Sequence, residues 1–128
     1  MACQIACRDN CNIDCHEAQS CDLNAGNKAV LDCHQAKAVC TVHAGDDGRV
    51  DCHGAGRCDV TAGARATIEC KGVKGGCAIN AGAGSVIDCR DSGACKVTCA
   101  GQCVVNCGDK SATVCPDGRT RVCPGTPC

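Results

Sequence analysis

Cysteine gives this chain its most abundant reactive group, because 19 of the 128 residues are Cys. Cysteines in such number either bind metal ions or pair as disulfides. Zinc sites and metal clusters favour closely spaced ligands. The sequence contains no CC, C-x-C or C-x-x-C, and its few C-x-x-x-C pairs fall where the repeat described below requires them. The spacing therefore favours disulfides over a metallothionein-like metal cluster or an iron–sulfur centre.

Carboxylates and basic side chains stand two residues apart at five further points of the sequence. Three of these points are carboxylate–imidazole pairs, which have the chemistry of zinc ligands. These pairs are Asp14/His16, Asp32/His34 and Asp51/His53. At the other two points Lys71 and Arg90 replace the histidine, and these side chains neutralise acids without suiting metal ligation. The pattern therefore favours a charge-compensated surface, with a divalent-metal site at the histidine pairs as the alternative.

Five-residue units of the form x-x-Φ-x-Cys or x-x-Φ-x-Ala, where Φ is Val, Ile or Leu, recur along residues 3–107. They fall into two sets that alternate along the chain. The first unit occupies residues 3–7, 21–25, 40–44, 58–62, 77–81 and 95–99. The second unit occupies residues 11–15, 29–33, 48–52, 66–70, 85–89 and 103–107. The full period alternates between 18 and 19 residues. Internal repeats of this length are typical of solenoid proteins, in which each repeat forms one coil.

Within each unit, positions 1, 3 and 5 are small or apolar and positions 2 and 4 are mostly polar. This period of two predicts a strand with one buried face. The turn between paired units begins with Gly in coils two to five, where we expect a positive φ. Because such short strands cannot bury a face alone, equivalent units must stack about 4.8 Å apart.

The predicted fold is therefore all-β: a two-sheet parallel β-solenoid of six 18–19-residue coils over residues 1–107. Residues 108–128 form a Cys- and Pro-containing cap or tail.

The strand pattern also predicts how the cysteines pair. If the two strands of a coil run antiparallel across a thin core, position 1 of the first unit faces position 5 of the second. One core-crossing disulfide per coil follows, namely Cys3–Cys15, Cys21–Cys33, Cys40–Cys52, Cys58–Cys70, Cys77–Cys89 and Cys95–Cys107. The end coils gain a second bridge each, namely Cys7–Cys11 and Cys99–Cys103. One bridge among Cys115, Cys123 and Cys128 leaves an odd thiol in the tail, either free or linked to a second chain.

The rest of the composition limits the function classes. The chain has no Phe, Tyr or Trp, so cross-links must replace the large side chains that usually dominate a core. A formal net charge of −1 offers no basic field for nucleic acid, and no apolar run approaches the ~20 residues of a membrane span. Disulfides need an oxidising compartment. We therefore expect a protein of the extracellular space or another oxidising compartment. Met1 leads directly into the first repeat, so we expect that an export signal has been removed.

The flat outer faces are where a solenoid is expected to bind its partners. Candidate binding residues on the first sheet are Asn24, Thr41, His43, Thr61, Asn80 and Thr98. The stacked, Cys-containing coils resemble the disulfide-braced β-solenoid antifreeze proteins of insects, and this resemblance over residues 3–107 implies ice binding by a flat sheet. In that group the ice-binding sheet carries Thr-x-Thr, whereas no strand here has Thr at both outward positions.

The sequence therefore predicts a non-enzymatic, rigid extracellular β-solenoid that acts as a structural or surface-binding protein. A core filled by cystines leaves no cleft for catalysis, and we expect no cofactor. Ice binding by the first sheet and divalent-metal binding along the Asp/His rows are the alternatives. Ice or another protein surface would suit as the partner. The doubly bridged end coils and the tail favour a monomer over a filament.

Overall fold

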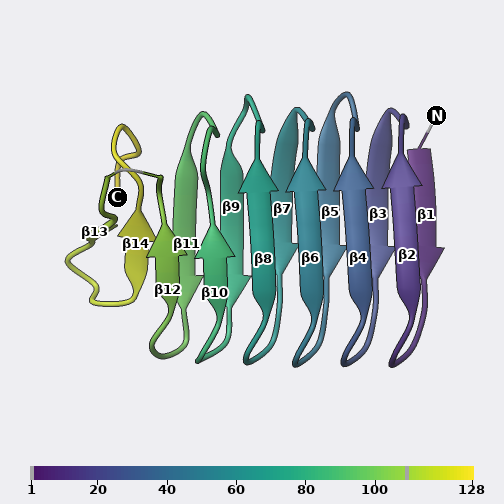
Figure 1. Cartoon of the computed structure of the whole chain (residues 1–128), viewed down its shortest axis with the longest axis horizontal. Helices are drawn as coiled ribbons and strands as arrows, with labels where there is room; N and C mark the ends of the chain where they lie inside the picture. The colour runs from purple at the N-terminus through teal and green to yellow at the C-terminus, as the bar shows by residue number, and fades with distance from the viewer. Residues whose placement is uncertain (1, 109) are drawn as a thin grey trace.

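The computed structural model describes residues 2–108 and 110–128, which form two facing sheets along the length of the molecule (Figure 1). The first sheet contains, in spatial order, β1 (Ala2–Ala6), β3 (Ser20–Asn24), β5 (Val39–His43), β7 (Arg57–Thr61), β9 (Cys77–Ala81), β11 (Cys95–Cys99), β14 (Thr120–Val122) and β13 (Thr113–Val114). The second contains β2 (Asn12–His16), β4 (Val30–His34), β6 (Arg49–His53), β8 (Thr67–Lys71), β10 (Val86–Asp88) and β12 (Val104–Asn106).

All neighbouring strands from β1 to β12 pair in parallel within their sheets. This confirms the predicted all-β, two-sheet parallel solenoid of six coils. Within the described residues no helix has the length and apolar character needed to cross a membrane.

Alternating burial explains why these short segments form strands. In β4, Leu31 and Cys33 are buried while Val30 is exposed. Parallel pairing repeats this pattern from coil to coil, so that Leu31 lies opposite Val50 in the next strand. The large buried aliphatic side chains that stack in this way are Leu23, Leu31, Val42, Val50, Val60, Ile68, Ile79, Ile87 and Val97. They form the continuous aliphatic core that the repeat predicted.

The turn from the first to the second strand of each coil corrects one expectation. In coil three, Oδ1 of Asn27 from the preceding coil accepts a hydrogen bond from the backbone N–H of Asp46 (2.8 Å). A Cβ added at Gly45 would overlap this Oδ1 atom. The positive φ expected at Gly45 occurs two residues later, at Asp47 (φ 56°). The glycine therefore permits close stacking of the coils, and the turn conformation does not require it.

Nine disulfides connect all but one of the cysteines, and two of them, Cys7–Cys11 and Cys99–Cys103, are as predicted. The six predicted pairs 12 residues apart are wrong. The pairs that are not formed are Cys3–Cys15, Cys21–Cys33, Cys40–Cys52, Cys58–Cys70, Cys77–Cys89 and Cys95–Cys107. Instead, the cysteine that ends a second-sheet strand bonds to the cysteine that begins the next coil. These bridges are Cys15–Cys21, Cys33–Cys40, Cys52–Cys58, Cys70–Cys77 and Cys89–Cys95.

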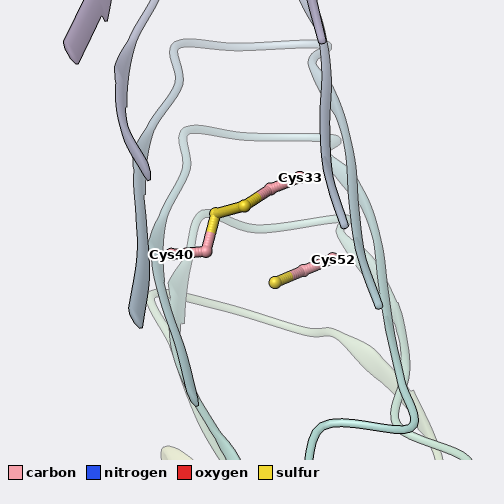
Figure 2. Close-up of side chains that lie close together, drawn as sticks. All are labelled: Cys33, Cys40 and Cys52. Atoms are coloured by element: carbon pink, nitrogen blue, oxygen red, sulfur yellow. A yellow bond between two sulfur atoms is a disulfide. The ribbon is translucent and has the colours of Figure 1, made fainter. Parts of the chain in front are cut away.

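The small distance between coils is the physical reason for this difference. Alternation along the strands places the cysteines on the inner faces as predicted. Coils stacked about 4.8 Å apart, however, give each second-sheet cysteine two potential partners on the opposite sheet. Figure 2 shows the bridge between Cys33 and Cys40 with the side chain of Cys52 beside it. The three sulfur atoms lie within 4.8 Å of one another, so sequence spacing alone does not choose between the partners.

The C-terminal segment closes one end of the first sheet. There β14 runs antiparallel to β11, and β13 pairs with β14 (Figure 1). The bridges Cys107–Cys123 and Cys115–Cys128 fasten this cap. The odd thiol predicted for the tail is instead that of Cys3, in the first strand of the first sheet.

Asp117 stabilises the turn of the cap. One carboxylate oxygen of Asp117 accepts hydrogen bonds from the backbone N–H groups of Arg119 (2.9 Å) and Thr120 (2.8 Å). The other accepts a hydrogen bond from the Thr120 hydroxyl (2.6 Å). The hydroxyl, followed by the two amides, lowers the pKa of Asp117 from 3.8 to about 2.

We expect the cap turn to loosen as the pH falls from about 4 to about 2. A carboxylate with a depressed folded pKa stabilises the fold above its unfolded pKa, and this contribution is lost as the pH falls through the folded value. Amide hydrogen exchange at Thr120 should therefore speed up, relative to its intrinsic rate, across this range. Asp117→Ala should already show the faster exchange at pH 5. Protection of Thr120 that stays constant from pH 4 to pH 2 would contradict this role of Asp117.

Candidate functional site

The three carboxylate–imidazole pairs lie side by side on the outer face of the second sheet. The parallel pairing of β2, β4 and β6 aligns the carboxylates in one row and the histidines in a second row two residues further on. The cysteine between each pair points into the core, so both partners must point outward. We call this surface the imidazole–carboxylate face. Its residues are Asp14, His16, Asp32, His34, Asp51 and His53.

Imidazoles on this face contact carboxylates of the preceding coil. Nε2 of His34 lies 3.5 Å from Oδ1 of Asp14. Nε2 of His53 lies 3.8 Å from Oδ1 of Asp32 and 3.9 Å from Oδ1 of Asp51. The spacing of two residues predicted contacts only between each histidine and the aspartate of its own strand. The contacts between adjacent coils could have been predicted from the repeat period, because it places equivalent residues of adjacent coils next to each other.

The histidine rings form a continuous row. The rings of His34 and His53 are stacked, with centroids 4.9 Å apart and an interplanar angle of 1°. The rings of His16 and His34 meet edge to face at 4.9 Å. The side chain of His34 is the least exposed of the three, at 25%. The middle ring of the row is therefore the one most shielded from solvent by its neighbours.

Two groups of three side chains bring potential metal ligands together on this face. In each group one ligand atom per residue lies within 4.8 Å of the others. The first group, triad 1, is Asp14, His16 and His34. The second group, triad 2, is Asp32, Asp51 and His53. Triad 1 has the composition of a two-His, one-carboxylate site, and triad 2 that of a two-carboxylate, one-His site.

Asp32 carries an unsatisfied polar atom at the centre of this face. Its Oδ1 atom is buried and has no hydrogen-bond partner. The Nε2 atom of His53, at 3.8 Å, is too far away for a hydrogen bond. An acceptor without a donor is unfavourable, although the Asp32 side chain as a whole is 37% exposed. A cation bound at triad 2 would supply the missing partner.

The face ends after the third coil. In coil four, Nζ of Lys71 lies 3.8 Å from Oε2 of Glu69. In coil five, a guanidinium nitrogen of Arg90 lies 2.9 Å from Oδ2 of Asp88. These carboxylates are neutralised by permanent cations, as the sequence predicted for a charge-compensated surface. Among the residues that the structure describes, the three-residue groups of potential metal ligands on the outer face of this sheet therefore lie in its first three coils.

The candidate residues of the first sheet fall into two rows. Five of them are aligned in one row, namely Asn24, His43, Thr61, Asn80 and Thr98. Thr41 lies in the neighbouring row, between Asp22 and Asp59. The acidic neighbours interrupt any array of threonines in that row. At one end, Oγ1 of Thr98 lies 3.3 Å from Oγ1 of Thr120, so the cap contacts the aligned row.

No family model, curated protein or solved structure matches the chain. Of the two outer faces, only the second sheet brings three-residue groups of potential metal ligands together within the part of the chain that the structure describes. The imidazole–carboxylate face is therefore the candidate functional site.

Proposed function

We propose that this protein is a rigid, non-enzymatic binding protein of an extracellular environment, and that it binds through its second sheet. The observation that carries the proposal is the imidazole–carboxylate face, on which three coils repeat the same two residue types in register. Disulfides in this number need oxidising conditions, which supports the extracellular setting. Side chains on cross-linked strands are held in place before binding, so little conformational entropy is lost when a ligand arrives.

A divalent transition-metal ion, such as zinc, is the ligand whose chemistry suits this face best. Zinc takes imidazole nitrogen and carboxylate oxygen at about 2.0–2.1 Å, which places neighbouring ligand atoms about 3.3 Å apart. The ligand atoms of triad 1 lie within 4.8 Å of one another, so small side-chain rotations would complete the site. Three protein ligands leave a fourth position for water or for a group on a partner. The metal would then link the scaffold to another surface.

Denaturation in guanidinium chloride, with zinc or with EDTA, tests this proposal. At 100 times its Kd, zinc should stabilise the folded state by about 2.7 kcal/mol for each site, and EDTA should reverse the effect. His34→Ala should remove the contribution of triad 1, and His53→Ala that of triad 2. His43→Ala, on the opposite sheet, is the matched control and should keep the full response. Metal binding at this face would be contradicted if zinc still stabilised the double variant His34→Ala/His53→Ala, or if zinc did not stabilise the wild type.

Ice binding through the first sheet is the second candidate, and the flat aligned row on that sheet favours it. The row consists of Asn24, His43, Thr61, Asn80 and Thr98. Thermal hysteresis and ice-crystal shaping separate this candidate from the first. If Thr61→Lys abolishes hysteresis while the double variant His34→Ala/His53→Ala keeps it, the function belongs to the first sheet. Absence of hysteresis in the wild type removes this candidate.

A further inference from the structure

Thirteen cysteines form one continuous column through the core, which we call the cystine column. Its first-sheet members are Cys3, Cys21, Cys40, Cys58, Cys77, Cys95 and Cys123. Its second-sheet members are Cys15, Cys33, Cys52, Cys70, Cys89 and Cys107. Cys123 continues the first-sheet row, because its backbone N–H donates a hydrogen bond to the carbonyl oxygen of Cys95 (3.1 Å). An odd number of cysteines always leaves one thiol unpaired, and here it is Cys3.

Sulfur atoms that are not bonded to each other also lie close together in this column. The sulfur of Cys52 lies within 4.8 Å of both sulfurs of the Cys33–Cys40 bridge (Figure 2). The sulfur of Cys123 has the same relation to the Cys89–Cys95 bridge. A change between staggered rotamers about the Cα–Cβ bond moves a cysteine sulfur by roughly 3 Å, which is about the difference between such a separation and the ~2.05 Å length of a disulfide bond. Cys52, the next cysteine of the column, therefore lies within reach of the Cys33–Cys40 bridge. At the other end Cys123, the bonded partner of Cys107, lies within reach of the Cys89–Cys95 bridge.

We propose that the cystine column is a thiol–disulfide exchange relay that moves one unpaired thiol along the solenoid. In the first step the thiolate of Cys3 attacks Sγ of Cys15. The Cys3–Cys15 bond forms while the Cys15–Cys21 bond breaks, and the electron pair leaves on the sulfur of Cys21. The Cys21 thiolate then attacks Cys33 in the same way. Repetition along the column ends with the thiol on Cys123.

Each step of the relay exchanges one disulfide for another. The number of bridges stays constant, so no oxidant or reductant is consumed. The proton lost by the attacking thiol is taken up by the thiolate that leaves. Because each exchange replaces a bridge between adjacent coils by a bridge between the two facing strands of one coil, the backbone and the aliphatic core need not unfold. The relay therefore transfers the unpaired thiol from Cys3 at one end of the solenoid to Cys123 at the other.

Burial decides where the unpaired thiol rests. Cys40 and Cys58 inside the column are 0% exposed, and an apolar interior disfavours the thiolate that exchange requires. Cys3 is only partly buried, whereas Cys123 is buried (8% exposed). The thiol therefore rests at Cys3 and passes through the interior transiently. At Cys3 it is placed to form a mixed disulfide with a disulfide-bearing partner, which would lock the column in the arrangement seen here.

Removal of one interior first-sheet cysteine tests the relay. Folded Cys40→Ala is incubated with oxidised glutathione at pH 8, quenched with acid, denatured and analysed by mass spectrometry without reduction. With a fixed set of bridges, Cys3 and Cys33 stay unpaired, as thiols or as glutathione adducts. With the relay, the Cys3 thiolate displaces Cys21 from Cys15, so that the two unpaired thiols are those of Cys21 and Cys33. Oxidised glutathione then converts these two thiols to a disulfide and is itself released as two molecules of reduced glutathione. We expect no unpaired cysteine and the new links Cys3–Cys15 and Cys21–Cys33.

A second-sheet variant serves as the matched control. Cys33→Ala leaves an odd number of column cysteines on each side of the gap, so two unpaired cysteines are expected with or without a relay. If Cys40→Ala does not fold, Cys123→Ala at the end of the column carries the same test. The relay then predicts no unpaired cysteine and Cys95–Cys107 among the links. Unpaired Cys3 and Cys33 in Cys40→Ala, or unpaired Cys3 and Cys107 in Cys123→Ala, overturns the proposal.

Discussion

Reduction and alkylation of all nine disulfides is expected to unfold the protein completely at room temperature. Bridges between successive coils join cysteines six or seven residues apart. Each is worth roughly 2–3 kcal/mol in the loop-entropy model. Even with strong non-additivity, several such bridges match the ~5–15 kcal/mol stability of a typical domain. No aromatic side chain is present to compensate for their loss. Far-UV circular dichroism should therefore show a disordered chain.

Removal of a single peripheral bridge provides the control for this experiment. Cys7 and Cys11 are partly buried in the first coil, outside the cystine column. The double variant Cys7→Ala/Cys11→Ala should remain folded and lose about 2 kcal/mol of stability. A fully reduced chain that keeps its β-sheet spectrum and melts cooperatively would show that the aliphatic core suffices for folding.

Leu31→Ala is expected to lower the free energy of unfolding by about 2–5 kcal/mol. Leu31 is 0% exposed and lies in register between Ile13 and Val50 of the neighbouring coils. The flanking Cys33–Cys40 bridge limits how far the walls of the new cavity can collapse. Guanidinium denaturation under non-reducing conditions measures the loss.

The adjacent Val30 supplies the matched control for Leu31. Its side chain points outward from the same strand and is 43% exposed. Val30→Ala should change stability by no more than about 0.5 kcal/mol, as is usual for a surface substitution. Similar losses for the two variants would contradict the assignment of the buried face of β4.

The fold could be predicted because one local rule repeats in every coil. The alternation of Val30, Leu31, Asp32 and Cys33 assigns each side chain to a face without any knowledge of neighbouring strands. The constant spacing of equivalent units then fixes the register between coils, because a shift by one residue would expose the core positions. This local rule did not predict why glycine is needed in the turns. The need for Gly45 arises from the Asn27 side chain of another coil, which no local pattern reveals.

The disulfide partners show where the sequence becomes insufficient. Strand alternation correctly places Cys33, Cys40 and Cys52 on inner faces. The choice between Cys40–Cys52 and Cys33–Cys40 depends on the positions of sulfurs in adjacent coils, and all three sulfurs lie within 4.8 Å of one another. For the same reason the position of the unpaired thiol was not predictable. When every core bridge shifts by one cysteine along the chain, the unpaired cysteine is Cys3 and no longer one in the C-terminal cap.

The rows of the candidate site were predictable, but its contacts were not. The repeat places Asp14 and His34 in adjacent coils, yet their 3.5 Å approach depends on how the side chains lean along the sheet. The buried, unpartnered oxygen of Asp32 is likewise a product of packing among neighbours. Both features strengthen the metal-binding interpretation beyond what residue types alone supported.

Ring-nitrogen NMR of the histidines during a zinc titration tests the central claim, that the imidazole–carboxylate face binds metal, most directly. The chain has only four histidines, and His43 on the first sheet is an internal control. Long-range ¹H–¹⁵N spectra should show the signals of His16, His34 and His53 shifting to saturation while those of His43 stay unchanged. Four histidines that respond alike, or none that respond at a large excess of zinc, would contradict the account.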